Sequence, residues 1–244
     1  MFFVVPCAKS TSKFTQRGYT MMGKKMGAFI TLEGIDGCGK STLARNLAAA
    51  LSAEGQAVLL TKEPGGSKLG KAIRQILHEQ PEPLEAISEF LLFAADRAEH
   101  FRKIIIPALQ AGTIVISDRC ADSSLAYQGY GRGLDTTFIT YVNAIAMVGV
   151  IPALTFFIEI DAAIAFARLR ERGTQLTSIE SRGIGYQERV QQGFERIFKN
   201  RSNVVHLDGR ATQEALLKQA IAHVHQHLEH LKRPMPSIDN LAGC

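Results

Sequence analysis

The chain has 244 residues, of which 46% are hydrophobic and 21% charged, a size and composition that fit one globular domain better than two. It contains no apolar run near the roughly 18 residues of a membrane span, so we expect no membrane partner. The net charge of +5 comes from scattered basic residues without an aromatic-basic stripe, which favours a pocket for several phosphates over a nucleic-acid surface.

Cysteine usage points to a reducing compartment. The four cysteines, Cys7, Cys38, Cys120 and Cys244, have no paired spacing. This argues against disulfides and against a structural zinc site, and it predicts a cytoplasmic protein.

The residues at both ends of the chain do not look like part of the folded domain. Residues 1–26 begin with an apolar run that is too short for the core of a signal peptide and continue with a stretch rich in Lys, Ser, Thr and Gly. We expect a disordered leader over 1–26, with a transit peptide as the alternative. One domain would then cover 27–232, and a frayed tail would follow over 233–244.

Five short, nearly continuous apolar runs have the pattern of buried parallel strands. In chain order they lie at 28–32, 57–61, 113–117, 154–160 and 203–207. Helical segments alternate with them at 40–53, 68–79, 84–111, 135–148, 161–172, 185–200 and 212–232. This alternation predicts an α/β fold, a doubly wound five-stranded parallel sheet with helices on both faces. Ligands of such sheets bind beyond the carboxyl ends of the strands, and the candidate functional segments 34–41, 63–67 and 118–128 each directly follow a strand.

The segment between the first strand and the first helix reads Gly-Ile-Asp-Gly-Cys-Gly-Lys-Ser over residues 34–41. It fits the phosphate-binding loop G-x-x-x-x-G-K-[ST], in which backbone N–H groups and the positive end of a helix surround an anion. Lys40 would reach the outer phosphates of ATP, and the Ser41 hydroxyl would bind Mg²⁺. The predicted ATP-binding residues are Gly34, Ile35, Asp36, Gly37, Cys38, Gly39, Lys40, Ser41 and Thr42.

Three further segments separate a kinase from other phosphate-loop proteins. They are Thr61-Lys-Glu-Pro-Gly-Gly-Ser67, Leu91-Leu-Phe-Ala-Ala-Asp-Arg97, and Ser117-Asp-Arg119 followed by Ser123-Ser-Leu-Ala-Tyr-Gln-Gly129. Together with the phosphate loop they resemble the thymidylate kinase family, which transfers the γ-phosphate of ATP to dTMP. The resemblance covers residues 29–230, with the motifs in the family's order. It implies the phosphate-loop NTPase fold, the substrates ATP and dTMP, Mg²⁺ and a homodimer.

Asp118 and Arg119 end a predicted strand beside the phosphate loop. A carboxylate in this position can hold hydrated Mg²⁺, so we expect Asp118 to share the metal with Ser41. The planar fork of Arg119 suits a substrate phosphate. The alternative is that the two residues form a salt-bridged strand end.

Phe93 and Arg97 are four residues apart, so they project from one face of a helix. The resemblance implies that Phe93 stacks on thymine and that Arg97 hydrogen-bonds its carbonyl edge. Helical periodicity by itself allows another interpretation, in which Phe93 belongs to the core and Arg97 is a surface cation.

The resemblance assigns the remaining substrate contacts. It implies that Arg74 grips the monophosphate and that Asp36 contacts the sugar or assists transfer. Tyr127 would crowd the sugar 2′ position. The dTMP-binding residues expected in this way are Glu63, Pro64, Arg74, Phe93, Arg97, Arg119, Ser123, Ser124, Tyr127 and Gln128. Lys62 and Ser67 depart from the family pattern, which usually has Arg and Thr there.

The expected lid, near 168–185, departs further. Phosphoryl transfer needs positive charge on the moving group, and the phosphate loop carries no arginine, so the lid must provide one. Family lids usually read D-R-x-E, whereas this chain has Thr177-Ser-Ile-Glu180. We hypothesise that Arg172 and Arg182 share the catalytic role with Lys40 and Asp36; Arg170 is a weaker candidate.

Other functions stay open at this point. The chain could be another nucleoside or nucleotide kinase, a phosphate-loop module that hydrolyses ATP without an acceptor, or a non-catalytic nucleotide-binding relative. An apolar helix face of Phe138, Tyr141, Val142 and Ile145 would suit the homodimer, and it could equally be internal core.

Overall fold

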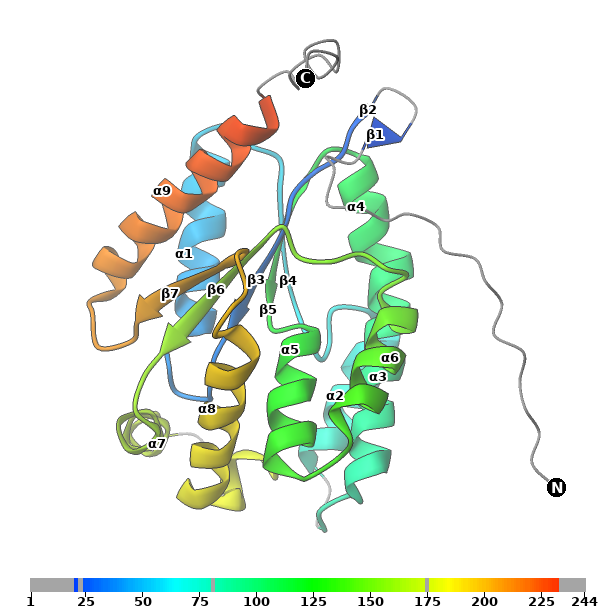
Figure 1. Ribbon diagram of the computed structural model, residues 1–244, viewed down its shortest axis with the longest axis vertical. Helices are drawn as coiled ribbons and strands as arrows, with labels where there is room; N and C mark the ends of the chain where they lie inside the picture. The colour runs from blue at the N-terminus through cyan, green and yellow to red at the C-terminus, as the bar shows by residue number, and fades with distance from the viewer. Residues whose placement is uncertain (1–19, 22–23, 80–81, 174–175, 233–244) are drawn as a thin grey trace, which may run out of the picture.

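Five parallel strands form the centre of the protein in the computed structural model, which describes residues 20–21, 24–79, 82–173 and 176–232. The strand order in the sheet is β4-β5-β3-β6-β7 (Figure 1). The strands span β3 (Phe29–Glu33), β4 (Val58–Lys62), β5 (Ile114–Asp118), β6 (Leu154–Glu159) and β7 (Val204–Asp208).

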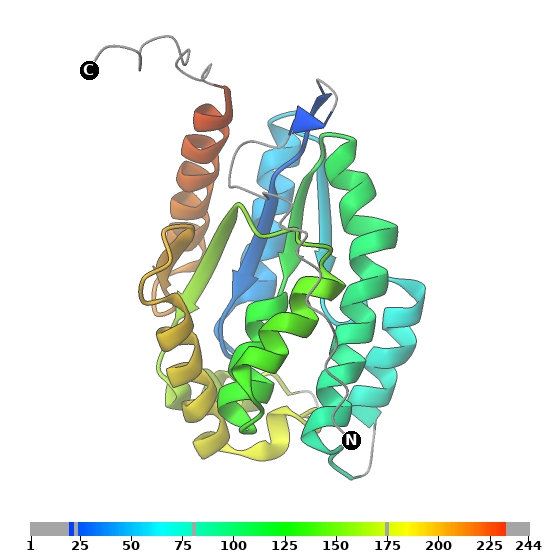
Figure 2. The same ribbon diagram turned by 45° about the vertical axis from the view of Figure 1, so that its right-hand side comes forward.

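Helices surround this sheet in the described part of the chain (Figures 1 and 2). They are α1 (Lys40–Ala53), α2 (Lys68–Glu79), α3 (Ala86–His100), η1 (Phe101–Ile105), α4 (Ile106–Gln110), α5 (Ala121–Ser124), η2 (Leu125–Gly131), α6 (Thr136–Ala146), α7 (Ala162–Glu171), η3 (Glu180–Arg182), α8 (Ile184–Phe198) and α9 (Gln213–Lys232). Helices α1 and α9 lie on one side of the sheet, and α4, α5, α6 and α8 lie on the other (Figure 1).

The alternation of side chains along β3 explains how both faces become buried. Ile30 belongs to a cluster with Leu43 and Leu47 of α1, on one face. Its neighbour Phe29 points to the other face and belongs to a cluster with Phe101 and Ile105 of η1. Because both faces are covered, each strand needs a nearly continuous apolar sequence, which is the pattern found along β3 and β5.

The predicted α/β fold is confirmed, and each strand lies within one residue of its predicted bounds. No helix was predicted over 118–128, but the segment contains α5 and the beginning of η2. Ser123 and Ser124 have low helix propensity, and Ala126 and Tyr127 instead stabilise the helix by packing in the core.

The predicted leader and tail fall largely outside the described residues. Within 1–26, β1 (Thr20–Met21) and β2 (Lys24–Lys25) form a short antiparallel pair, while the tail over 233–244 is not described. None of the described helices is long and apolar enough to cross a membrane.

Candidate functional site

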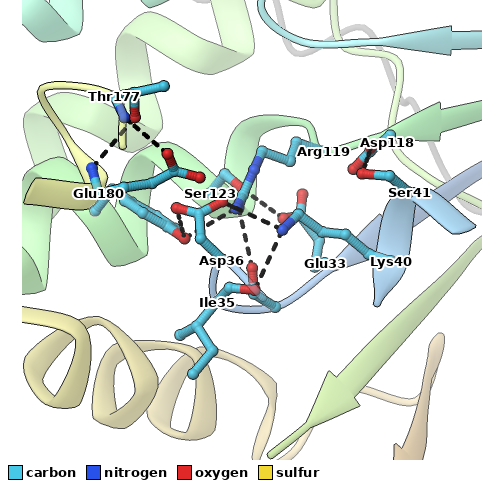
Figure 3. Close-up of polar contacts among 12 residues, drawn as sticks. Glu33, Ile35, Asp36, Lys40, Ser41, Asp118, Arg119, Ser123, Thr177 and Glu180 are labelled. Atoms are coloured by element: carbon cyan, nitrogen blue, oxygen red, sulfur yellow. Dashed lines mark hydrogen bonds and ion pairs between the residues drawn. The ribbon is translucent and has the colours of Figure 1, made fainter. Parts of the chain in front are cut away.

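The phosphate loop connects β3 to α1 and wraps around its own lysine. Gly37 and Gly39 have φ angles of 86° and 100°, and a Cβ at Gly37 would lie 2.2 Å from the carbonyl oxygen of Ala165. Glycine is therefore required at position 37. Lys40 is the first residue of α1, and its Nζ donates to the Ile35 carbonyl at 3.2 Å and to Asp36 at 3.5 Å (Figure 3).

Ser41 and Asp118 meet beside this lysine (Figure 3). The Ser41 hydroxyl donates to Oδ2 of Asp118, while Oδ1 of Asp118 is buried and has no hydrogen-bond partner among the described residues. An orphaned carboxylate oxygen next to a hydroxyl fits a hard cation such as Mg²⁺, which takes few protein ligands and completes its shell with water and phosphate oxygens. The described residues contain no group of three or more His, Cys, Asp or Glu that could hold a metal by themselves.

Arg119 lies at the centre of a partly buried polar network (Figure 3). Its guanidinium donates to the Gly34 carbonyl, the Ser123 hydroxyl, the Asp36 carboxylate and the Tyr127 hydroxyl. Tyr127 in turn donates to Asp36 at 2.9 Å. Burial acts to raise the pKa of Asp36, but the charges of Arg119 and then Lys40 outweigh it and hold that pKa well below its usual range. Asp36 therefore stays a carboxylate.

Glu33, the last residue of β3, supports the turn that carries Arg119. Its carboxyl group accepts from the backbone N–H of Cys120 at 2.7 Å and from the Ser123 hydroxyl at 2.6 Å. Burial first, and the nearby Asp122 second, raise the pKa of Glu33 to about 8. Glu33 was not among the predicted site residues, although a charged residue that ends a buried apolar strand was a usable signal.

Arg97 of α3 is buried, with only 1% of its surface exposed. Its Nε donates to Glu63 at 2.8 Å, and its Nη1 donates to Asn143 at 2.7 Å and Ser124 at 3.2 Å. Within the described residues its Nη2 makes no hydrogen bond, although Arg97 lines the cavity. The alternative that Arg97 is a surface cation is wrong. Asn143 was not anticipated, because nothing in the sequence brings α6 next to α3.

One cavity of about 500 Å³ joins these groups at the carboxyl ends of the central strands. The predicted site residues that line it are Asp36, Lys40, Ser41, Glu63, Pro64, Arg74, Phe93, Arg97, Asp118, Arg119, Ser123, Ser124, Tyr127, Gln128 and Arg172. Its lining also includes Arg45, Lys62, His78, Cys120, Thr177, Ile179 and Glu180, which were not among the predicted site residues. The structure places outside this lining Gly34, Ile35, Gly37, Cys38, Gly39, Thr42 and Arg182.

Two arginines of the expected lid have different surroundings. Arg172 lines the cavity and its Nη2 donates to both oxygens of Glu180, at 3.1 and 3.2 Å. Glu180 also accepts from the backbone N–H of Thr177 at 2.8 Å. Arg182, by contrast, donates to Glu89 and to the Tyr186 hydroxyl. The residue that stands where an arginine is usual, Ser178, donates to the Leu77 carbonyl of α2 at 3.0 Å.

The charge of the cavity suits anionic ligands. Its lining contains seven Lys or Arg residues against four Asp or Glu residues. A parallel α/β sheet, a glycine loop leading into a helix at the carboxyl end of a strand, and a basic cavity at that end define a nucleotide-binding protein of the phosphate-loop class.

Comparison with known proteins narrows this class. The family model described as "Thymidylate kinase" matches residues 32–234. The chain is 41% identical over 223 residues to the "Thymidylate kinase" of Trichodesmium erythraeum, covering 85% of this chain and 99% of the relative. It is 39% identical over 204 residues to that of Nostoc punctiforme, covering 82% and 97%, and 43% identical over 173 residues to that of Solidesulfovibrio magneticus, covering 68% and 83%. The chain therefore belongs to the thymidylate kinase family.

Proposed function

We propose that the protein transfers the γ-phosphoryl group of ATP to dTMP, forming ADP and dTDP, with Mg²⁺ as the metal. The observation that carries this proposal is that one cavity is lined both by Lys40 of the phosphate loop and by Phe93 and Arg97 of α3. Two nucleotides bound there would meet with their phosphates facing each other, and such positioning is the main requirement of phosphoryl transfer.

In this proposal the ATP phosphates occupy the loop between β3 and α1. The backbone N–H groups at the start of α1 and the ammonium of Lys40 provide positive charge there. Ser41 and the orphaned Oδ1 of Asp118 would hold Mg²⁺. When bound, this ion neutralises and orients the phosphate oxygens.

The other end of the cavity would receive dTMP. Phe93 offers an aromatic face for thymine, and the free Nη2 of Arg97 offers a donor to a base carbonyl, with Ser124 and Gln128 beside it. Glu63 would act through Arg97, which it fixes at 2.8 Å. Arg74 would hold the monophosphate from a side chain that also donates to the Pro64 carbonyl at 3.1 Å.

The Asp36–Arg119–Tyr127 network would lie between the two nucleotides. Arg119 already has protein partners, so we assign it a shared role: it fixes Asp36 and Tyr127 against the sugar and adds charge near the monophosphate. Since the acceptor oxygen belongs to an ionised phosphate, transfer needs no strong base.

Among the lid arginines, we assign the charge on the moving group to Arg172, because it lines the cavity. It would exchange its carboxylate partner, Glu180, for phosphate oxygens when nucleotides are bound. The shared catalytic role for Arg182 stays a prediction.

We further propose a homodimer formed through α6. Phe138, Tyr141 and Ile145 are exposed to 39%, 68% and 54%, whereas Val142 packs in the small cluster around Phe90. Large apolar side chains grouped on one exposed helix face commonly mark an interface. A cytoplasmic location is also proposed, and the buried free thiols of Cys38 and Cys120 fit it.

A coupled assay of ADP release tests the function. Purified protein is given ATP and Mg²⁺ with dTMP, dUMP, other nucleoside monophosphates, deoxynucleosides or no acceptor. The proposal requires the highest kcat/KM for dTMP and little ADP release without an acceptor. A higher value for another acceptor would identify a different nucleotide kinase, and equal ADP release in all samples would identify an ATP-hydrolysing module.

A further inference from the structure

Glu89 is a buried carboxylate that the proposed chemistry does not use. It lies on α3, is 2% exposed and does not line the cavity. Its Oε1 accepts from Gln128 at 2.9 Å and from Arg182 at 3.3 Å. Its Oε2 accepts from Arg132 at 3.1 Å and from the second terminal nitrogen of Arg182. A buried carboxylate is stable only with such partners, so these groups hold one another in place.

Among the partners of Glu89, Gln128 lies at the proposed nucleoside end of the cavity. Gln128 lines the cavity, and its amide is fixed by Glu89. Phe93 lies one turn after Glu89 on the same helix, so the two side chains project from one face of α3. A nucleoside placed against Phe93 and Gln128 would therefore contact residues that Glu89 and α3 position.

Arg182, another partner of Glu89, belongs to the segment 177–182, which contributes to the cavity wall. Arg182 and Glu180 share the short helix η3, and Glu180 holds both Arg172 and the backbone N–H of Thr177. Arg182 also donates to the Tyr186 hydroxyl at 3.2 Å. Because Arg182 is two residues from Glu180, its two bonds to Glu89 fix the turn that presents Arg172 to the cavity.

We propose that Glu89 and Arg182 are positioning residues that couple the nucleoside end of the cavity to the wall carrying Arg172. This inference rests on the proposed function, because it requires a nucleoside monophosphate at one end and a triphosphate at the other. Arg182 then acts through Glu89 and does not touch the moving phosphoryl group. A nucleoside monophosphate that contacts Gln128 favours, through Glu89, the bound position of Arg182 and hence of Arg172. Coupling of binding free energies is reciprocal, so each nucleotide tightens binding of the other.

The experiment measures the Kd of dTMP by calorimetry, alone and with a saturating non-hydrolysable ATP analogue plus Mg²⁺. The ratio of the two values is the coupling. Arg182→Ala removes the hydrogen bonds between Glu89 and the segment 177–182. Arg132→Ala is the matched control, because Arg132 pairs with the same carboxylate but follows η2 and is not part of that segment. Arg182→Lys keeps the charge and loses the two-pronged bond.

We expect a coupling of about five-fold or more for the wild type, a ratio near one for Arg182→Ala, and a wild-type ratio for Arg132→Ala. Arg182→Lys should give an intermediate ratio, and it serves as the test if thermal melting shows that Arg182→Ala does not fold. Two outcomes overturn the inference: equal Kd ratios for wild type and Arg182→Ala, or an equal loss of coupling in Arg182→Ala and Arg132→Ala. In either case, dTMP turnover by the wild type would still support the proposed function. A wild type that neither binds nor phosphorylates dTMP overturns both.

Discussion

Ser41 and Asp118 are 77 residues apart in the chain, yet the hydroxyl of one donates directly to the carboxylate of the other. Ser41 follows the phosphate lysine in α1, and Asp118 ends β5, the neighbour of β3 in the sheet. Parallel pairing places both at the same edge, and this shared edge is what allows one cation to contact both residues.

The first prediction concerns this pair. Asp118→Asn keeps an acceptor for Ser41 but removes the negative charge, so the Mg²⁺ concentration needed for half-maximal rate should rise by about ten-fold or more. Initial rates across a Mg²⁺ titration measure it. Asp122→Asn is the control, since Asp122 pairs with Arg201 and lies outside the cavity lining. An unchanged Mg²⁺ requirement in Asp118→Asn would contradict the proposed metal site.

The second prediction concerns the nucleobase. Phe93→Ala removes the proposed stacking surface, which is worth about 1–3 kcal/mol per base, so KM for dTMP should rise by roughly ten-fold or more. KM for ATP should stay near the wild-type value. Leu91→Ala provides a matched control on the same helix, because Leu91 is 48% exposed and does not line the cavity. Equal effects on both KM values would argue that Phe93 is only a packing residue.

The third prediction concerns the moving phosphoryl group. Arg172→Ala should lower kcat by about 100-fold or more, because a transition-state arginine contributes at least that much in related chemistry. Arg170→Ala, which removes an exposed arginine from the last turn of α7, two residues before Arg172, should stay near wild type. Turnover at saturating ATP and dTMP measures both variants. Two near-wild-type rates would show that Arg172 does not carry the role.

The fourth prediction concerns pH and Glu33. The folded protein keeps a proton on Glu33 until its raised pKa of about 8, whereas an unfolded chain releases that proton near the ordinary value of 4.5. Between these values the unfolded state binds fewer protons, so this group lowers the free energy of unfolding as pH rises.

Glu33→Gln removes this titration but keeps an acceptor for Ser123. The stability of wild type relative to Glu33→Gln should therefore decrease from pH 5 to pH 8, by at most about 1.4 kcal/mol per pH unit. Urea unfolding at several pH values gives the difference directly. A difference that is constant over this range would mean that Glu33 is already ionised in the folded state at pH 5.

The fifth prediction concerns assembly. Tyr141→Glu places a charge at the centre of the exposed α6 face, where Tyr141 is 68% exposed. It should convert the proposed dimer to a monomer, as measured by light scattering during size-exclusion chromatography. Ile164→Glu changes an apolar residue of α7 that is 40% exposed, and it should leave the dimer intact. A wild type that is already monomeric would contradict the proposal for α6.

Local patterns in the sequence were sufficient for the fold class and for the ATP end of the site. The continuous apolar runs predicted the parallel strands within one residue, because burial on both faces leaves no room for alternation. The phosphate loop was recognisable because its glycines and lysine have a fixed spacing within eight consecutive residues. The nucleoside end was anticipated only through resemblance to a family, since the spacing of Phe93 and Arg97 by itself allowed two interpretations.

What the sequence by itself determined is therefore the local structure: where strands and helices lie, and which segment can surround a phosphate. Only the tertiary structure decided that Arg97 is buried between Glu63 and Asn143, and that Arg172 faces the cavity while Arg182 turns to Glu89. The physical reason is that these contacts join segments distant in the chain. Helical and strand periodicities fix which way a side chain points from its own element, but packing of the elements against one another selects its partner.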